Sequence, residues 1–161
     1  AWLDALTELS RLRDEGLIAE LGVTNFDAAH FNLALADGIP LRTNQVSFSL
    51  LDRRAGGPLV EVCTTNDTFI LAYGVLCGGF LSERWLGKPE PTDITDWSKM
   101  KYKRFIDTDC GWASFQHILG IASEIARKHD PSLSHGATRE CLARARLAVL
   151  IPAPSFVMCS H

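Results

Sequence analysis

Three positions combine a chemically useful side chain with a place in or just after a short apolar segment. Asn25 follows the segment 18–24, Gln45 lies within 43–50, and Tyr73 lies within 69–75. Asparagine and glutamine amides both donate and accept hydrogen bonds, and a tyrosine ring can stack on a planar ligand. An unpaired amide buried in an apolar strand costs on the order of a few kcal/mol, which favours a ligand-binding role for Gln45.

Asn25 and Tyr73 each have a second interpretation. Asn25 precedes Phe26 and Asp27, and asparagine often begins the turn into a helix. Tyr73 has apolar neighbours, so it also suits a core aromatic ring whose hydroxyl finds a partner. Its place near the end of a predicted strand supports a stacking role equally well.

The cysteines follow no metal-binding spacing. There are five of them, without a CxxC pair, which favours a reduced intracellular compartment and predicts no metal site. Cys77, beside Gly78 and Gly79, has no neighbouring histidine or cation in the sequence that would lower its thiol pKa. We therefore expect a packed thiol there, with a reactive thiol as the alternative.

The composition indicates an ordinary globular protein. Of 161 residues, 47% are hydrophobic and 22% charged, and the net charge of -3 comes from interspersed signs. Without a basic stripe, nucleic acid is not an expected partner. No segment has the length of a membrane span and no signal peptide is recognisable, so we expect a soluble cytoplasmic protein.

The hydrophobic pattern predicts alternating helices and strands. A helix is expected from Trp2 to Arg13 with Gly16 as its stop, and Asp27 is expected to cap a helix over 28–36. A further helix begins at Pro58, and Ser114 is the expected cap of a helix reaching Ala126. Strands are predicted at about residues 18–24, 43–50, 69–75 and 147–151, and a last helix at 135–146.

Between Leu76 and Gly111 the periodicity disappears. A long loop at about 76–111 is therefore predicted, as a functional lid or a disordered segment. The cations of 99–104 are expected on its solvated face, with contact to a substrate or cofactor phosphate as the alternative. Trp85, Trp97 and Trp112 either line a substrate pocket or fold the loop down.

Alternating strands and helices favour an α/β fold with a parallel sheet, either doubly wound or closed as a barrel. A complete (β/α)8 TIM barrel typically needs about 250 residues. This chain has 161 residues and four predicted strands. We therefore expect one domain over 1–161 with a partial (β/α)8 fold. Such a half-barrel has two unpaired sheet edges, which favour self-association.

Three segments resemble the aldo-keto reductase family in order and spacing. Residues 21–26, Leu-Gly-Val-Thr-Asn-Phe, resemble the family's Gly-Val-Ser-Asn-Phe, with Thr24 in place of the serine. Residues 44–51 and 71–81 resemble the next two strands. The resemblance extends from the first helix to Pro152 and corresponds to about the fifth to eighth strands of the family barrel.

This resemblance implies an NAD(P)H-dependent oxidoreductase that interconverts a small-molecule carbonyl and an alcohol by hydride transfer. NADP is the implied cofactor and NAD the alternative. The positions that bind the nicotinamide carboxamide correspond to Thr24, Asn25 and Gln45. The aromatic ring that stacks on nicotinamide corresponds to Tyr73, and the loop over the pyrophosphate corresponds to Leu76, Cys77 and Gly78.

The family's catalytic tyrosine, lysine, aspartate and histidine lie on its first four strands, which this chain is not expected to contain. None of the five histidines matches the family position. After Ile151-Pro152, residues 153–156 replace the glycine and basic residue that hold the 2'-phosphate of NADP. We expect no catalytic residue and negligible turnover, because hydride transfer without a positioned acid leaves an alkoxide unstabilised.

Two other interpretations stay open. The first is a non-catalytic cofactor-binding or interaction module, since some barrels related to the family are cofactor-sensing subunits of larger assemblies. The second is a truncated gene product without independent activity. The alanine at position 1 and the tail after Pro152 suit the second interpretation.

Overall fold

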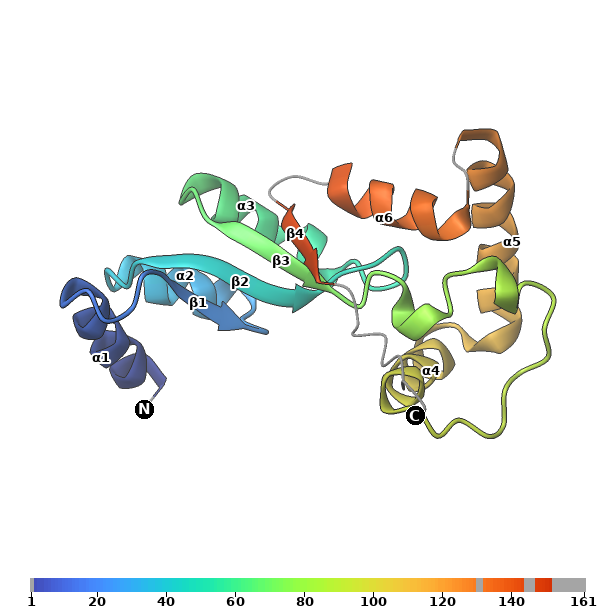
Figure 1. Cartoon of the computed structure of the whole chain (residues 1–161), viewed down its shortest axis with the longest axis horizontal. Coiled ribbons are helices and arrows are strands. Elements are labelled where there is room, and N and C mark those ends of the chain that lie inside the picture. Colours follow the sequence, from blue (N-terminus) through green and yellow to red (C-terminus); the bar gives the residue numbers. More distant parts are fainter. Residues whose placement is uncertain (1, 130–131, 144–146, 152–161) are drawn as a thin grey trace, which may run out of the picture.

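The structure is a computed structural model that describes residues 2–129, 132–143 and 147–151, with side chains described as far as residue 143. Helices and strands alternate through its first half (Figure 1). The strands are β1 (Leu21–Thr24), β2 (Leu41–Ser47), β3 (Phe69–Tyr73) and β4 (Leu147–Ile151). The α-helices are α1 (Trp2–Asp14), α2 (Ala28–Ala36), α3 (Pro58–Thr65), α4 (Trp97–Asp109), α5 (Gly111–His129) and α6 (Leu133–Ala143).

The four strands form one parallel sheet in the order β1-β2-β3-β4, which confirms the predicted α/β fold of a partial barrel. Helices α2 and α3 are the crossovers between the first three strands, and both lie behind the sheet in Figure 1. Asp27 caps α2 as predicted, because its side chain accepts a hydrogen bond from the backbone N–H of His30 at 2.8 Å. In the described part of the chain, β1 and β4 are the edges of the sheet.

Side chains alternate between two faces along β2 and β3. Asn44 and Val46 are buried, as are Ile70 and Ala72, and this face packs on Phe31 and Ala34 of α2 and on Leu59 and Cys63 of α3. On the other face, residues 43, 45, 47, 69, 71 and 73 are only partly buried. We call this second face the open face. Parallel strands with period-two alternation place all of its members on the same side.

Helices α4, α5 and α6 form a second cluster beyond the carboxyl ends of the strands (Figure 1). Phe80, Leu81, Phe115 and Leu119 are fully buried there, around Tyr102. A separate set of apolar contacts thus fixes α4 beside the strand ends. No helix in the described ranges is both long and apolar enough to span a bilayer.

The loop predicted at about 76–111 was wrong in its second half, where residues 97–109 form α4. Charged residues hid the helical pattern, because only Tyr102, Lys103 and Ile106 of this helix are buried. Asp96 caps α4 by accepting from the Lys99 N–H at 2.8 Å. Lys103 is tolerated in the interior because it pairs with Glu90 and Asp107.

Several boundaries also differ from the prediction. Helix α5 begins at Gly111, so Ser114 lies within it and does not cap it. The first strand is shorter than expected and begins at Leu21, whereas β2 begins at Leu41 and ends at Ser47. Helix α6 begins at Leu133, and positions 144–146 of the predicted last helix lie outside the described residues.

Candidate functional site

The carboxyl ends of β1, β2 and β3 meet at one edge of the sheet, as in other parallel α/β folds. Thr24 is in register with Gln45, and Ser47 with Tyr73. The pairing continues one residue beyond β1, where the Asn25 N–H donates to the Gln45 carbonyl at 2.8 Å. Residues from three segments of the sequence are therefore held within one small area.

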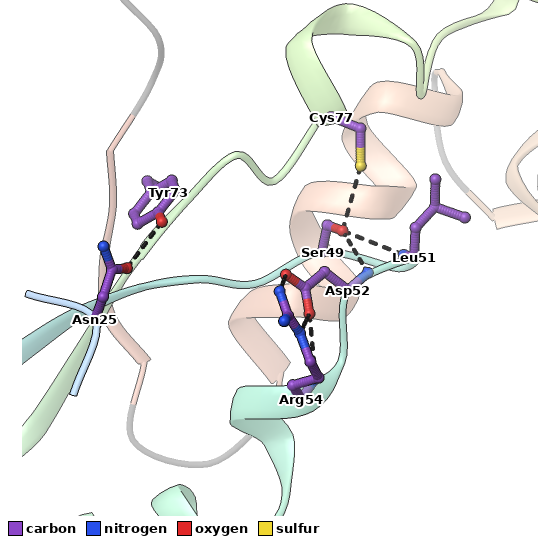
Figure 2. A network of polar contacts seen from close by, with 7 residues as sticks. All are labelled: Asn25, Ser49, Leu51, Asp52, Arg54, Tyr73 and Cys77. Carbon is purple, nitrogen blue, oxygen red and sulfur yellow. Dashed lines mark hydrogen bonds and ion pairs between the residues drawn. The ribbon is translucent and has the colours of Figure 1, made fainter. Parts of the chain in front are cut away.

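Tyr73 and Asn25 touch each other directly, although 48 positions separate them. The Tyr73 hydroxyl donates to Oδ1 of Asn25 at 2.8 Å (Figure 2). Asn25 has a φ of 59°, in the left-handed region that asparagine tolerates better than most residues. The turn role and the site role considered for Asn25 are thus compatible, and the hydroxyl of Tyr73 has a partner at the rim of the sheet.

Gln45 and its neighbour Asn44 point to opposite faces of the sheet. The expectation of a buried unpaired amide was wrong for Gln45, because its side chain is partly exposed on the open face. The buried amide is Asn44, which is fully buried, donates to the Phe26 carbonyl at 2.8 Å and accepts from the Phe26 N–H at 3.4 Å. Sequence reasoning missed Asn44, although its period-two relation to Val46 and Phe48 was a usable signal.

Thr24 and Gln45 keep their polar atoms available. In the described part of the chain, neither side chain has a hydrogen-bond partner. Thr24 is exposed, and the Gln45 amide offers both donors and an acceptor. These two side chains and the Tyr73 ring are on the same face of the sheet by register.

The backbone of the turn after β3 is hydrogen-bonded within the turn and lies close to α4. The N–H groups of Cys77 and Gly79 donate to the carbonyls of Gly74 and Leu76 at 2.8 and 2.9 Å. A Cβ on Gly78 would lie 3.2 Å from the Ser98 carbonyl oxygen. Glycine therefore permits this turn to approach the first turn of α4, and two of the N–H groups near the predicted pyrophosphate segment already have partners.

The Cys77 side chain points into the second cluster and not toward a ligand site. It is 1% exposed, and its thiol donates to the Ser49 hydroxyl at 3.3 Å (Figure 2). Burial raises the pKa of the Cys77 thiol to about 12, although the Ser49 hydrogen bond acts in the opposite direction. The thiol therefore stays protonated near neutral pH, in agreement with the expected packed thiol.

Ser49 and Asp52 organise the segment that follows β2. The Ser49 hydroxyl accepts from the N–H groups of Leu51 and Asp52 at 3.2 and 2.9 Å, and Arg54 binds Asp52 through two contacts of 2.8 Å (Figure 2). Burial opposes ionisation of Asp52, but hydrogen bonds from Arg54 and Ser47 outweigh it and hold the pKa of this carboxyl below its usual value. Sequence reasoning did not single out this network.

Two cavities flank Tyr73, with volumes of about 580 and 390 Å³. Both are lined by Ser47, Arg54 and Tyr73. The larger also has Asn25, Asp27 and the first residues of α3 on its wall, and the smaller has Lys101, Tyr102 and Arg104 of α4. Thr24, Gln45 and residues 76–78 line neither cavity.

None of the tryptophans lines either cavity, and Trp85 and Trp112 pack against the second cluster. Trp85 and Trp112 contact each other with ring centroids 5.9 Å apart, and both contact the buried Phe80 ring. Trp97 is 84% exposed. Of the two expectations for these residues, the structure supports the packing role for Trp85 and Trp112.

The histidines lie away from the cavity walls in the described part of the chain. His30 is three residues from Asp27, which lines the larger cavity. Its Nδ1 forms a hydrogen bond with the Asp27 carboxylate at 2.8 Å, and its ring packs beside those of Trp2 and Phe26. Hydrogen bonds from the His30 backbone and side chain lower the pKa of Asp27. The described residues contain no cluster of three metal-ligating side chains.

Comparisons with known proteins agree with this architecture. The family model described as Aldo/keto reductase family matches residues 2–158. The flagellar radial spoke protein 5 of Chlamydomonas reinhardtii is 30% identical over 116 residues, which are 70% of this chain and 22% of that protein. A glycerol dehydrogenase structure from Gluconobacter oxydans matches 94% of this chain with a TM-score of 0.75 at 22% identity, and the match covers 45% of its own chain. The chain thus spans less than half the length of each.

Proposed function

Because the chain belongs to the aldo/keto reductase family, we propose that it is the nicotinamide-binding part of an NAD(P)H-dependent oxidoreductase that interconverts a carbonyl and an alcohol. The observation that carries this proposal is the group of available polar atoms beside the Tyr73 ring. Thr24, Asn25 and Gln45 come together there at the carboxyl ends of β1 and β2.

The donor set suits a carboxamide. A primary amide needs an acceptor for its NH₂ group and a donor for its carbonyl, and the unpaired Gln45 amide can supply both. Thr24 adds a hydroxyl. The Tyr73 ring, held by its hydrogen bond to Asn25, supplies a flat surface for stacking. When bound, a nicotinamide cofactor supplies the hydride, and these residues would fix the position of its ring.

The remainder of the proposed cofactor site is less complete. The turn at Leu76, Cys77 and Gly78 would meet the pyrophosphate through its backbone, since the Cys77 thiol is buried. NADP is the proposed cofactor, with NAD as the alternative, and the segment after residue 151 that would distinguish them lies outside the described residues. Positions 153–156 are part of that segment.

We also propose that these 161 residues do not reduce a carbonyl by themselves. Protonation of the forming alkoxide needs a positioned acid within hydrogen-bond reach. Two tyrosines line the cavities, and burial raises the pKa of one of them, Tyr102, to about 12, with nearby Cys77 and Tyr73 contributing in the same direction. The Tyr73 hydroxyl already donates to Asn25. Turnover by this chain with an aldehyde and NADPH would contradict this part of the proposal.

Direct binding tests the cofactor site. Titration of the chain with NADPH and with NADH, followed by calorimetry, should show saturable binding, and the ratio of the two dissociation constants decides between NADP and NAD. Tyr73→Leu removes the stacking surface and should weaken binding about tenfold, a typical effect for one lost aromatic stacking contact. Trp97→Leu is the control, because this exposed ring lines neither cavity. A chain that binds neither nucleotide at millimolar concentration would refute the proposed function.

A second candidate function is an interaction module, which a specific observation favours. Among the residues that the structure describes, the sheet has β1 and β4 as its edges and one open face, so a second copy or another chain can pair with it. The relative from Chlamydomonas reinhardtii is named as a radial spoke protein of the flagellum. Sedimentation at micromolar concentration tests self-association. A dimer is expected, and a well-folded monomer would count against pairing through these edges.

A further inference from the structure

One cation lies over the ring that the proposed function assigns to nicotinamide. The Lys101 ammonium is 4.6 Å from the centroid of the Tyr73 ring and 5.3 Å from that of Tyr102. Both distances fall within the range of cation–π attraction. Lys101 is exposed and also lines the smaller cavity, so the ammonium is at the surface where a ligand would arrive.

The position of Lys101 follows from how α4 docks. Tyr102 is buried and its hydroxyl occupies the space above Gly74, where an added Cβ would lie 1.7 Å from the Tyr102 oxygen. Gly74 follows Tyr73 in the chain, and Lys101 precedes Tyr102. The close contact between Tyr102 and Gly74 therefore brings the preceding residues, Lys101 and Tyr73, together, and the Lys101 ammonium lies over the Tyr73 ring.

Lys101 differs from Lys103 and Arg54 because no carboxylate in the described ranges pairs with it, and it differs from Arg104 because it lies over the Tyr73 ring. Lys103 pairs with Glu90 and Asp107, and Arg54 pairs with Asp52. The smaller cavity also contains Arg104 and Asp109, so three cations face two carboxylates there, and one of the two is bound to Arg54. The charge of Lys101 is thus left to act on whatever lies against the Tyr73 ring.

We propose that Lys101 sets the redox preference of the nicotinamide site, favouring the reduced ring over the oxidised one. This inference rests on the proposed function. The oxidised nicotinamide ring carries a positive charge and the reduced ring is neutral. If the ring stacks on the face held by Lys101, the displaced ammonium stays close by and repels the positive charge of the oxidised ring. If it stacks on the opposite face, the oxidised ring and Lys101 are two cations that share one tyrosine. Both arrangements disfavour the oxidised form.

The size of this effect is modest because Lys101 is exposed. One unit charge near another at a protein surface is worth enough to change an affinity by about fivefold. Added salt should reduce the effect. NADP+ and NADPH carry the same phosphates, so the ratio of their dissociation constants isolates the charge on the ring from any attraction between α4 and the phosphates.

The test is to measure the dissociation constants of NADP+ and NADPH, by calorimetry, for the wild-type chain and three variants. Lys101→Met removes the charge, and the ratio of the NADP+ to the NADPH constant should fall about fivefold. Lys101→Arg keeps the charge and the cation–π contact and should preserve the ratio. Lys99→Met removes a cation from the first turn of the same helix that lies over neither ring, and it should leave the ratio within twofold.

The outcomes separate the two proposals. If the wild type binds both nucleotides and Lys101→Met leaves the ratio unchanged, the inference about Lys101 is wrong and the cofactor site stands. An equal fall in the ratio for Lys99→Met would also overturn it, because the effect would then belong to the helix charge as a whole. If neither nucleotide binds to the wild type, the proposed function fails, and the role of Lys101 fails with it.

Discussion

Along β2 and the residue after it, positions 44, 46 and 48 face the helices, whereas 43, 45 and 47 face the open side. The two sets alternate residue by residue but have different roles. Asn44 binds the Phe26 backbone and holds the β1–α2 connection in place, while Gln45 has no hydrogen-bond partner among the described residues. Side chains on the first face should therefore control stability, and those on the second should control ligand binding.

Gly74 gives the largest expected effect on the framework side. Gly74→Ala adds a Cβ at 1.7 Å from the Tyr102 hydroxyl, at a residue with φ of 72°. The combined clash and left-handed strain should cost on the order of 3 kcal/mol of unfolding free energy, measured by urea denaturation. Gly38→Ala is the control, because its φ is 84° but no atom lies within 4 Å of the new Cβ. It should cost about 1 kcal/mol. If Gly74→Ala and Gly38→Ala lowered the unfolding free energy equally, the Tyr102 side chain would have to move aside without cost.

Asn44→Ala should be the next largest effect. The substitution removes the fully buried Asn44 amide and leaves the N–H and carbonyl of the partly buried Phe26 without their side-chain partner. Such unsatisfied groups cost about 2–3 kcal/mol of unfolding free energy. Chemical denaturation should also show that Gln45→Ala, one residue away, changes stability by less than about 0.5 kcal/mol. A large loss for Gln45→Ala would remove the distinction between the two faces.

Gln45→Ala should act on cofactor binding instead. Loss of the amide removes both a donor and an acceptor for the carboxamide, so NADPH should bind about tenfold more weakly, which is worth about 1.4 kcal/mol. Calorimetric titration measures this change. Thr43→Ala is the control, since Thr43 lies on the same face but nearer the amino end of β2. Unchanged binding in Gln45→Ala would refute the carboxamide role of this residue.

The elements that sequence predicts well are those whose local signals are strong. Asp27 and the apolar residues after it fix α2, and the apolar runs around Val46 and Ile70 identify β2 and β3. Helix α4 was missed because its stability comes from tertiary contacts. A lysine at position 103 predicts a surface residue, and its burial depends on ion pairs with Glu90 and Asp107.

The site was predictable in its members but not in its geometry. The motif resemblance selected Asn25 and Tyr73, which the structure joins by a hydrogen bond. The contact between Lys101 and Tyr73 depends on the docking of α4 and has no signature in the local sequence. Likewise, one polar residue in a strand cannot be assigned to a face until the register is known. Gln45, expected to be buried, lies on the open face, and the buried amide is that of its neighbour Asn44.

Asp52 gives the smallest expected effect and tests whether the segment after β2 belongs to the framework. Its pKa in the folded chain is below the ordinary value of 3.8, so the ionised carboxylate stabilises the fold above that pH. Asp52→Asn should therefore lower the unfolding free energy by about 1 kcal/mol at pH 7. The difference in unfolding free energy between wild type and variant should persist to about pH 5. It should shrink as the pH falls below 3.8 through the lowered pKa of Asp52.

Urea denaturation of both proteins from pH 7 to about pH 2.5 measures this gap. In an Arg54→Met background the pH-dependent part should be reduced, because Arg54 provides two of the contacts to the carboxylate. A gap that widens as the pH falls would mean that Asp52 is held protonated by its burial. Arg54 would then lack its counter-charge and would act with Lys101 on any ligand in the smaller cavity that they line.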